Sequence, residues 1–244
     1  MGFSSRSYAR SYVGLPGLPR GIKWLLIANV SIFLVQWITR GAYDYYFALV
    51  PAELVRHLAV WGLVTYMFLH GGISHILWNM LALWMFGSML EQSWGTRRFL
   101  QLYFCSGIGA GICVALLSFL FGGAQVATIG ASGAIFGVML ACAVMWPDQI
   151  VLFNFLFPIK MKYMVMIIGA IAFLGAWNPN SGVSNIGHLG GMAFGYLFIK
   201  MPRISTRGFH PLAPVRDSYK AWKLARAKKK FQVYLKKQRS DHIN

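Results

Sequence analysis

Six apolar runs that are long enough, or nearly long enough, to cross a bilayer constrain this chain more than any other feature. A spanning helix needs roughly 20 mostly apolar residues. Charged residues make up only 12% of the chain, against about 25% in a typical soluble domain. We therefore expect an all-α, polytopic membrane protein. The predicted spans are Trp24–Thr39, Ile73–Leu90, Phe99–Phe121, Ile129–Trp146, Tyr163–Trp177 and Val183–Ile199.

The distribution of basic residues predicts that both termini are cytoplasmic, because short cytoplasmic loops carry an excess of Lys and Arg. With six spans, the basic loops around residues 97 and 160 share one side with both termini, and the loops at 122–128 and 178–182 contain no Lys or Arg. Only Arg40 and Arg56, in a long first loop, break the pattern. The expected organisation is a cytoplasmic N-terminal segment (1–22), a six-helix membrane domain (23–200) and a basic cytoplasmic tail (201–244).

One apolar stretch, Ile150–Ile159, is too short for a span and contains Pro158. Ten residues suit an interfacial segment better than a membrane helix. A seventh span would also move the tail, which holds more than half of the basic residues, to the other side of the membrane. We therefore predict an interfacial segment.

The net charge of +17 follows largely from this orientation signal, so no nucleic acid is needed to explain it. Between Arg216 and Lys237 the tail mixes basic and aromatic residues. This composition suits a helix lying on anionic lipid, and it suits a solvated, partly disordered tail equally well.

The N-terminus shows neither a convincing signal-peptide cleavage site nor a transit-like composition. We therefore read the first apolar run as a retained helix and favour a bacterial inner membrane. Cys105, Cys113 and Cys142 all lie in predicted spans and are expected to be free thiols.

Several polar side chains lie inside the predicted spans, where they are costly and usually functional. The second, fourth and sixth predicted helices start on the non-cytoplasmic side. A rise of 1.5 Å per residue then puts the polar groups of three helices within about 10 Å of one interface. These residues are His75, Asn79, Ser132, Asn185 and His188.

The residue types fit acyl transfer. We predict Ser132 as the nucleophile and His188 as the base that takes its proton. His75 and Asn79, spaced i and i+4, share one helix face. They could donate to the oxyanion together with the backbone N–H of Ser132 near a helix N-terminus.

No carboxylate is expected beside His188, so the sequence predicts a Ser-His dyad rather than a triad. Phe136, one turn after Ser132, could stack on the His188 ring. The acids are Asp44, Glu53, Glu91, Asp148, Asp217 and Asp241.

Small residues four apart predict where the helices touch. Gly133 with Gly137, and Gly191 with Gly195, form small-xxx-small steps that allow close packing of membrane helices. A contact between these two faces would bring Ser132 to His188.

Three motifs together resemble the rhomboid intramembrane serine proteases. They are His75 with Asn79, the Gly130-Ala-Ser132-Gly133 element, and the run from Gly187 through His188, Gly191 and Gly195. The resemblance covers residues 20 to 200. It implies a six-helix bundle that cuts within or near a substrate's transmembrane helix, with lateral entry between the second and fifth helices. It also implies that His70 has a structural role at the head of the second helix.

Two residues depart from the family pattern. Trp61 is followed by Gly62, where the family often has arginine. Phe136 replaces a frequent tyrosine and loses its hydroxyl. Neither change removes a group that the resemblance marks as catalytic.

Two other functions stay open from the sequence. A non-proteolytic protein of the same fold could bind membrane clients, and a small transporter could use His70, His75 and His188 as a proton relay. A metal site is disfavoured because His70 and His75 do not share a helix face, and no cofactor is expected. The expected partners are single-span or polytopic membrane proteins and the lipid bilayer.

Overall fold

The computed structural model describes residues 18–153, 157–176 and 185–201, together with six residues of the tail. The chain divides into two units, Met1–Met201 and Pro202–Asn244. The fold below is that of the first unit. Most of the segment between Arg216 and Lys237, for which a lipid-bound helix and a solvated tail were both left open, falls outside the described residues, as do Trp177 and Val183.

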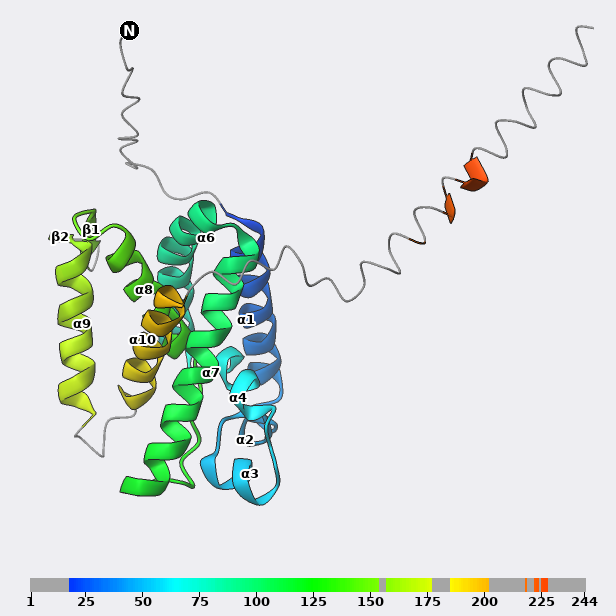
Figure 1. The fold of residues 1–244 in the computed structure, drawn as a ribbon. Helices are drawn as coiled ribbons and strands as arrows, with labels where there is room; N and C mark the ends of the chain where they lie inside the picture. The colour runs from blue at the N-terminus through cyan, green and yellow to red at the C-terminus, as the bar shows by residue number, and fades with distance from the viewer. Residues whose placement is uncertain are drawn as a thin grey trace, which may run out of the picture. The chain divides into compact units, whose positions relative to one another are not determined.

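The described part of the first unit is mostly helical (Figure 1). Three of its helical segments are long and apolar enough to cross a membrane, namely Arg20–Ile38, Ile73–Trp94 and Thr96–Phe121. Shorter apolar helices follow, as expected of a multi-pass membrane protein. The helical elements are α1 (Arg20–Ile38), α2 (Asp44–Phe47), α3 (Pro51–Arg56), α4 (Gly62–Thr65), η1 (Tyr66–Phe68), α5 (Ile73–Ala82), η2 (Leu83–Gly87), α6 (Ser88–Trp94), α7 (Thr96–Phe121), α8 (Ser132–Met145), α9 (Met161–Gly175) and α10 (Asn185–Lys200).

The segment predicted as a pure interfacial stretch forms a β-hairpin, so the all-α prediction is wrong at this point. Strand β1 (Ile150–Phe153) pairs antiparallel with β2 (Phe157–Lys160). β-branched and aromatic residues favour strands. Pro158 would break a helix interior, whereas the edge of a two-stranded hairpin tolerates it. The hairpin connects α8 to α9, and its four-residue strands are shorter than the roughly 9 to 11 residues of a membrane-spanning strand.

Helices α7, α8 and α10 pack on one another through small residues (Figure 1). A Cβ added at Gly191 of α10 would lie 1.9 Å from the Gly133 carbonyl oxygen of α8, and one added at Gly195 would lie 2.8 Å from the Gly137 Cα. The predicted contact between the two glycine faces is therefore present. Such an approach is possible only where both helices lack side chains.

The start of α1 is capped by a distant carboxylate. Pro19 offers no side-chain cap, and the buried Glu91 of α6 accepts hydrogen bonds from the backbone N–H groups of Gly21 and Ile22, both at 2.8 Å. Thr96 Oγ1 donates to the same carboxylate at 2.6 Å. These bonds satisfy donors that the first turn of a helix leaves free, and they place Glu91 in a structural role.

The long first loop folds into α2, α3 and α4 and is fixed to the segment before α8. Leu49 and Thr128 exchange backbone hydrogen bonds of 3.0 and 2.9 Å. Within the loop, Trp61 Nε1 donates to the Tyr46 carbonyl at 2.9 Å. A Cβ at the buried Gly62 would lie 3.0 Å from the Ala48 carbonyl oxygen, so any side chain there would require the Ala48 backbone to shift slightly.

Candidate active site

Ser132 is the first residue of α8. The sequence predicted it as the fourth residue of a helix starting at Ile129, and this was wrong because the backbone turns at Gly130. Gly130 has φ +124°, a conformation that L side chains rarely adopt. Its N–H donates to the Tyr66 carbonyl at 2.9 Å, which holds the turn against η1. The N–H of Ser132 is consequently one of the free donors at a helix N-terminus.

His188 of α10 reaches Ser132 directly. Its Nε2 lies 2.8 Å from Ser132 Oγ, and the residue is only 8% exposed. The Phe136 ring stacks on the imidazole, with centroids 4.1 Å apart and an interplanar angle of 7°. Phe136 therefore fixes the plane of the imidazole without a hydrogen bond.

The Nε2 atom of His75 lies beside Gly130, close to Ser132. Its Nδ1 accepts a hydrogen bond from the Gly71 N–H at 3.2 Å, so in the neutral ring we assign the proton to Nε2. A Cβ built on Gly130 would lie 2.9 Å from His75 Nε2 and 3.8 Å from Ser132 Oγ. A third helix thus brings a donor beside the dyad.

Asn79 lies one turn below His75 and is buried. Its Nδ2 donates to the His75 carbonyl at 3.0 Å, which fixes the amide on its own helix and occupies one of its two N–H groups. The second N–H is available for another acceptor.

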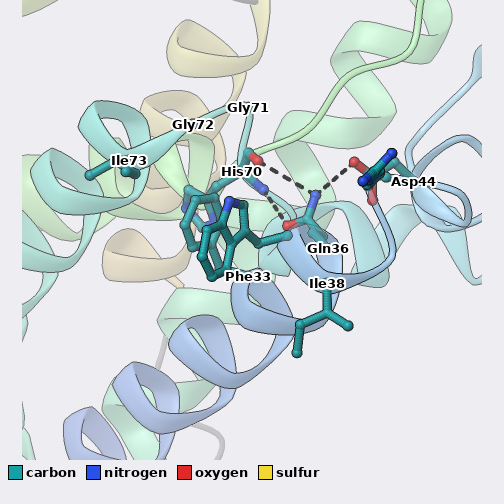
Figure 2. A pocket seen from close by; sticks show the side chains of 11 residues that line it. Phe33, Gln36, Ile38, Asp44, His70, Gly71, Gly72 and Ile73 are labelled. Carbon is teal, nitrogen blue, oxygen red and sulfur yellow. Dashed lines mark hydrogen bonds between the residues drawn. The ribbon is translucent and has the colours of Figure 1, made fainter.

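His70 lies next to His75, with their ring centroids 5.0 Å apart. It is buried, and within the described structure neither of its ring nitrogens has a hydrogen-bond partner. Its backbone is held by Gln36, which accepts from the His70 N–H at 3.0 Å and also donates to Asp44 at 2.9 Å (Figure 2).

These groups border an open hollow of about 660 Å³ between α1 and the head of α5 (Figure 2). His70, Gly71 and Gly72 line it, whereas Ser132 and His188 do not. The hollow is therefore separate from Ser132 and His188.

The four acids that the structure describes are all engaged away from His188. Asp44 bonds to Gln36, Glu53 to His57, Glu91 to the start of α1, and Asp148 to Lys160 and Lys162. Across the described ranges there is also no group of His, Cys, Asp or Glu that could hold a metal ion. The three cysteines are free.

Sequence reasoning missed two residues that position the site. Tyr66 receives the Gly130 N–H on its carbonyl, and its hydroxyl donates to the Gly107 carbonyl of α7 at 2.7 Å. Gln36 holds the His70 backbone. Both act on backbone groups far along the chain, so no local pattern could reveal them. Asn185, noted for its polarity, begins α10 two residues before Gly187.

Comparison with known proteins identifies relatives. The family model described as the rhomboid domain matches residues 57–203. The chain is 36% identical over 150 residues to RHOMBOID-like protein 1 of Arabidopsis thaliana, covering 62% of this chain and 36% of that protein. It is 37% identical over 139 residues to Rhomboid protease GluP of Bacillus subtilis, covering 56% of this chain and 25% of that protein. The matched segment thus spans only about a third or a quarter of these relatives' lengths.

Proposed function

Because the chain belongs to the rhomboid family, as its motifs predicted, we propose that it is an intramembrane serine endopeptidase that hydrolyses a peptide bond in or near a substrate's transmembrane helix. In this proposal α1, the continuous segment α5–η2–α6, α7, α8, α9 and α10 are the six spans, and both termini are cytoplasmic. We propose a bacterial inner membrane as the location.

Charge along the described elements supports this orientation. Arg20, Lys23 and Arg97 lie at helix ends on one side, together with Lys160 and Lys200. Figure 1 draws the hairpin at one end of the helices and α2–α4 toward the other. Since basic residues favour the cytoplasm, α2–α4 and the Ser132 end of α8 belong to the opposite side.

The observation that carries the proposal is the 2.8 Å contact between Ser132 Oγ and His188 Nε2. It lies within the reach of about 2.6 to 3.2 Å that a general base needs. His188 removes the Ser132 proton as Oγ attacks the scissile carbonyl. The imidazolium then protonates the leaving amine, and a water activated by His188 hydrolyses the acyl-enzyme. Stacking on Phe136 keeps Nε2 pointed at Oγ in place of an acid.

The oxyanion of the tetrahedral intermediate is stabilised by three donors in this proposal. They are His75 Nε2, the free N–H of Asn79 and the backbone N–H of Ser132. The position 2.9 Å from His75 Nε2 and 3.8 Å from Ser132 Oγ that a Gly130 Cβ would take supports this role for His75. A side chain there would fill the space, so the glycine keeps room for the developing charge.

Substrate access follows from physical limits on helices. An intact helix hides its carbonyls in hydrogen bonds, so a substrate must unwind before Ser132 can attack. We propose entry between α5 and α9, which stands at the edge of the described helices (Figure 1). Substrates with Gly or Pro near the cleavage site unwind at lower cost.

The client-binding alternative has no observation in its favour. A protein that only holds clients does not require a serine hydroxyl in contact with a buried imidazole. The relay alternative is weakened because His75 Nδ1 already accepts a backbone hydrogen bond.

A single-span reporter tests the proposal, incubated with the purified protein in liposomes. We expect cleavage by the parent protein and none by Ser132→Ala or His188→Ala. The matched control is Ser93→Ala, an exposed serine on α6, which should cleave at the parent rate. Replacing Gly or Pro in the reporter by Leu should slow cleavage. Absence of cleavage by the folded parent across several helix-destabilised reporters would reject the proposal and leave client binding.

A further inference from the structure

The β1–β2 hairpin exposes apolar side chains that no described element covers. Ile150 is 62% exposed, Leu152 51% and Phe157 66%. Adjacent strand residues alternate between faces, and Val151 and Ile159, which pair across the hairpin, pack against the core. Ile150 and Leu152 consequently face away from the protein, whereas Phe157 lies on the same face of the hairpin as Ile159. Exposing such an apolar surface to water is unfavourable.

The hairpin leads directly into α9, which also exposes apolar side chains. Strand β2 ends at Lys160, and α9 begins at the next residue, Met161. Along α9, Tyr163, Met166 and Phe173 are 49%, 66% and 54% exposed, as expected of side chains that face lipid. Exposed apolar side chains on the hairpin are thus followed along the chain by exposed apolar side chains on α9.

The hairpin and the first turn of α9 are also joined through their backbones. The Met161 N–H donates to the Gln149 carbonyl at 2.8 Å, and the Lys162 N–H donates to the Pro147 carbonyl at 3.1 Å. These bonds tie the start of α9 to the residues that precede β1. Whatever holds the hairpin in place also holds this end of α9.

Two lysines give the hairpin base a positive charge. Lys160 Nζ and Lys162 Nζ lie 3.1 and 2.9 Å from the same Asp148 oxygen. The hydrogen bonds from Lys162 and Lys160 lower the pKa of Asp148, so the carboxylate stays charged and neutralises only one of the two ammonium groups. Both lysines are partly exposed, at 48% and 37%, and can bind a further anion.

We propose that the hairpin lies in the cytoplasmic interface of the bilayer, with Ile150 and Leu152 among the acyl chains and with Lys160 and Lys162 bound to the phosphates of anionic lipids. An apolar surface bordered by lysines is the chemistry that binds such an interface. The hairpin then anchors the cytoplasmic end of α9, so motions of α9 are confined to its other end. The cytoplasmic side rests on the topology in the proposed function, but the anchoring does not require proteolysis.

Collision accessibility of spin labels tests the proposal. Single cysteines at Ile150 and Leu152 are labelled in the Ser132→Ala protein, which is expected not to cleave, after Cys105, Cys113 and Cys142 are replaced by Ala. Oxygen concentrates in lipid, and a water-soluble nickel complex stays outside. The references are labels at Met166 on the lipid-facing side of α9 and at Ser93, which is exposed at the end of α6.

Both hairpin labels should give oxygen-to-nickel ratios near that of Met166. Ratios near that of Ser93 would overturn the proposal. Spin–spin broadening between hairpins would also overturn it, because a second copy would then cover the surface.

A second arm tests the lysines, using vesicles with and without phosphatidylglycerol. Anionic lipid should raise the oxygen-to-nickel ratio at Leu152, and the Lys160→Gln/Lys162→Gln double variant should lose that rise. The matched control, Arg20→Gln/Lys23→Gln, removes two charges at the start of α1 and should retain it. A rise that persists in the hairpin variant, or no rise in the parent, would overturn the assignment of the lysines.

Discussion

Gly191→Ala is the substitution whose effect on the dyad can be worked out most directly. The added Cβ would lie 1.9 Å from the Gly133 carbonyl oxygen. An unstrained carbon–oxygen contact is at least about 3.3 Å, so α8 and α10 must separate by roughly 1.4 Å. Neither atom is the end of a flexible side chain, so the helices themselves must move.

The separation acts on the site because Gly133 follows Ser132 and Gly191 lies one turn after His188. When most of this helix separation is transmitted to the site, the 2.8 Å contact between Ser132 and His188 opens to about 4 Å, beyond the reach of a general base. A misplacement of about 1 Å can cost about 100-fold in rate. We therefore expect kcat/KM for the reporter to fall by about two orders of magnitude.

The variant should still fold. Overpacking costs about 1 to 3 kcal/mol, and alanine regains about 0.5 to 1 kcal/mol of helix propensity relative to glycine. The net loss of stability is about 0 to 2.5 kcal/mol, which thermal unfolding in detergent would measure. The loss in rate therefore exceeds what a change in folded fraction could explain.

Gly169→Ala is the matched control. Its Cβ would lie 3.3 Å from Met192 Cε, the end of a flexible side chain that can shift by a few tenths of an ångström. This variant should cleave within about twofold of the parent. A Gly191→Ala protein that cleaves at the parent rate would refute the view that close contact between α8 and α10 positions the dyad.

Three further predictions concern single contacts. Phe136→Leu removes the stack on His188, which is worth about 0.5 to 1.5 kcal/mol, so cleavage should slow by about 3- to 10-fold. Phe136→Tyr should keep the parent rate. Equal rates for all three proteins would exclude a role for stacking. His75→Ala should lower kcat by about 10² to 10³, as expected for loss of an oxyanion donor. Asn79→Ala should lower kcat less, because one of the Asn79 N–H groups is bound to the His75 carbonyl. The reverse order in single-turnover rates would contradict the assignment of His75 as the stronger oxyanion donor. Glu91→Gln leaves one of two backbone N–H groups at the start of α1 without an acceptor, so the free energy of unfolding should fall by about 1 to 3 kcal/mol. The cleavage rate per folded molecule should change little. A stability equal to the parent's would show that Glu91 does not cap α1.

Much of the fold could be predicted from the sequence because membrane helices are defined by length and apolarity. The helix positions were right to within a few residues at most ends. The glycine steps also predicted the α8–α10 contact, because two backbones can approach closely only where side chains are absent. The family was predicted from motifs that contain these glycines together with Ser132 and His188.

What could not be predicted depends on contacts between distant backbone groups. The Gly130 turn makes Ser132 the first residue of α8, and it depends on the Tyr66 carbonyl 64 positions earlier in the chain. The Glu91 cap on α1 joins residues about 70 apart. The hairpin was missed because a ten-residue apolar stretch has no periodicity that separates a strand pair from a short interfacial helix.

Covalent labelling of Ser132 is the measurement that tests the central claim most directly. The parent protein is treated with a fluorophosphonate, and the modified peptide is identified by mass spectrometry. A serine activated by His188 should be labelled selectively at Ser132, and His188→Ala should abolish the labelling in protein that remains folded. Labelling that is absent in the folded parent, or unchanged in His188→Ala, would contradict the Ser132–His188 dyad.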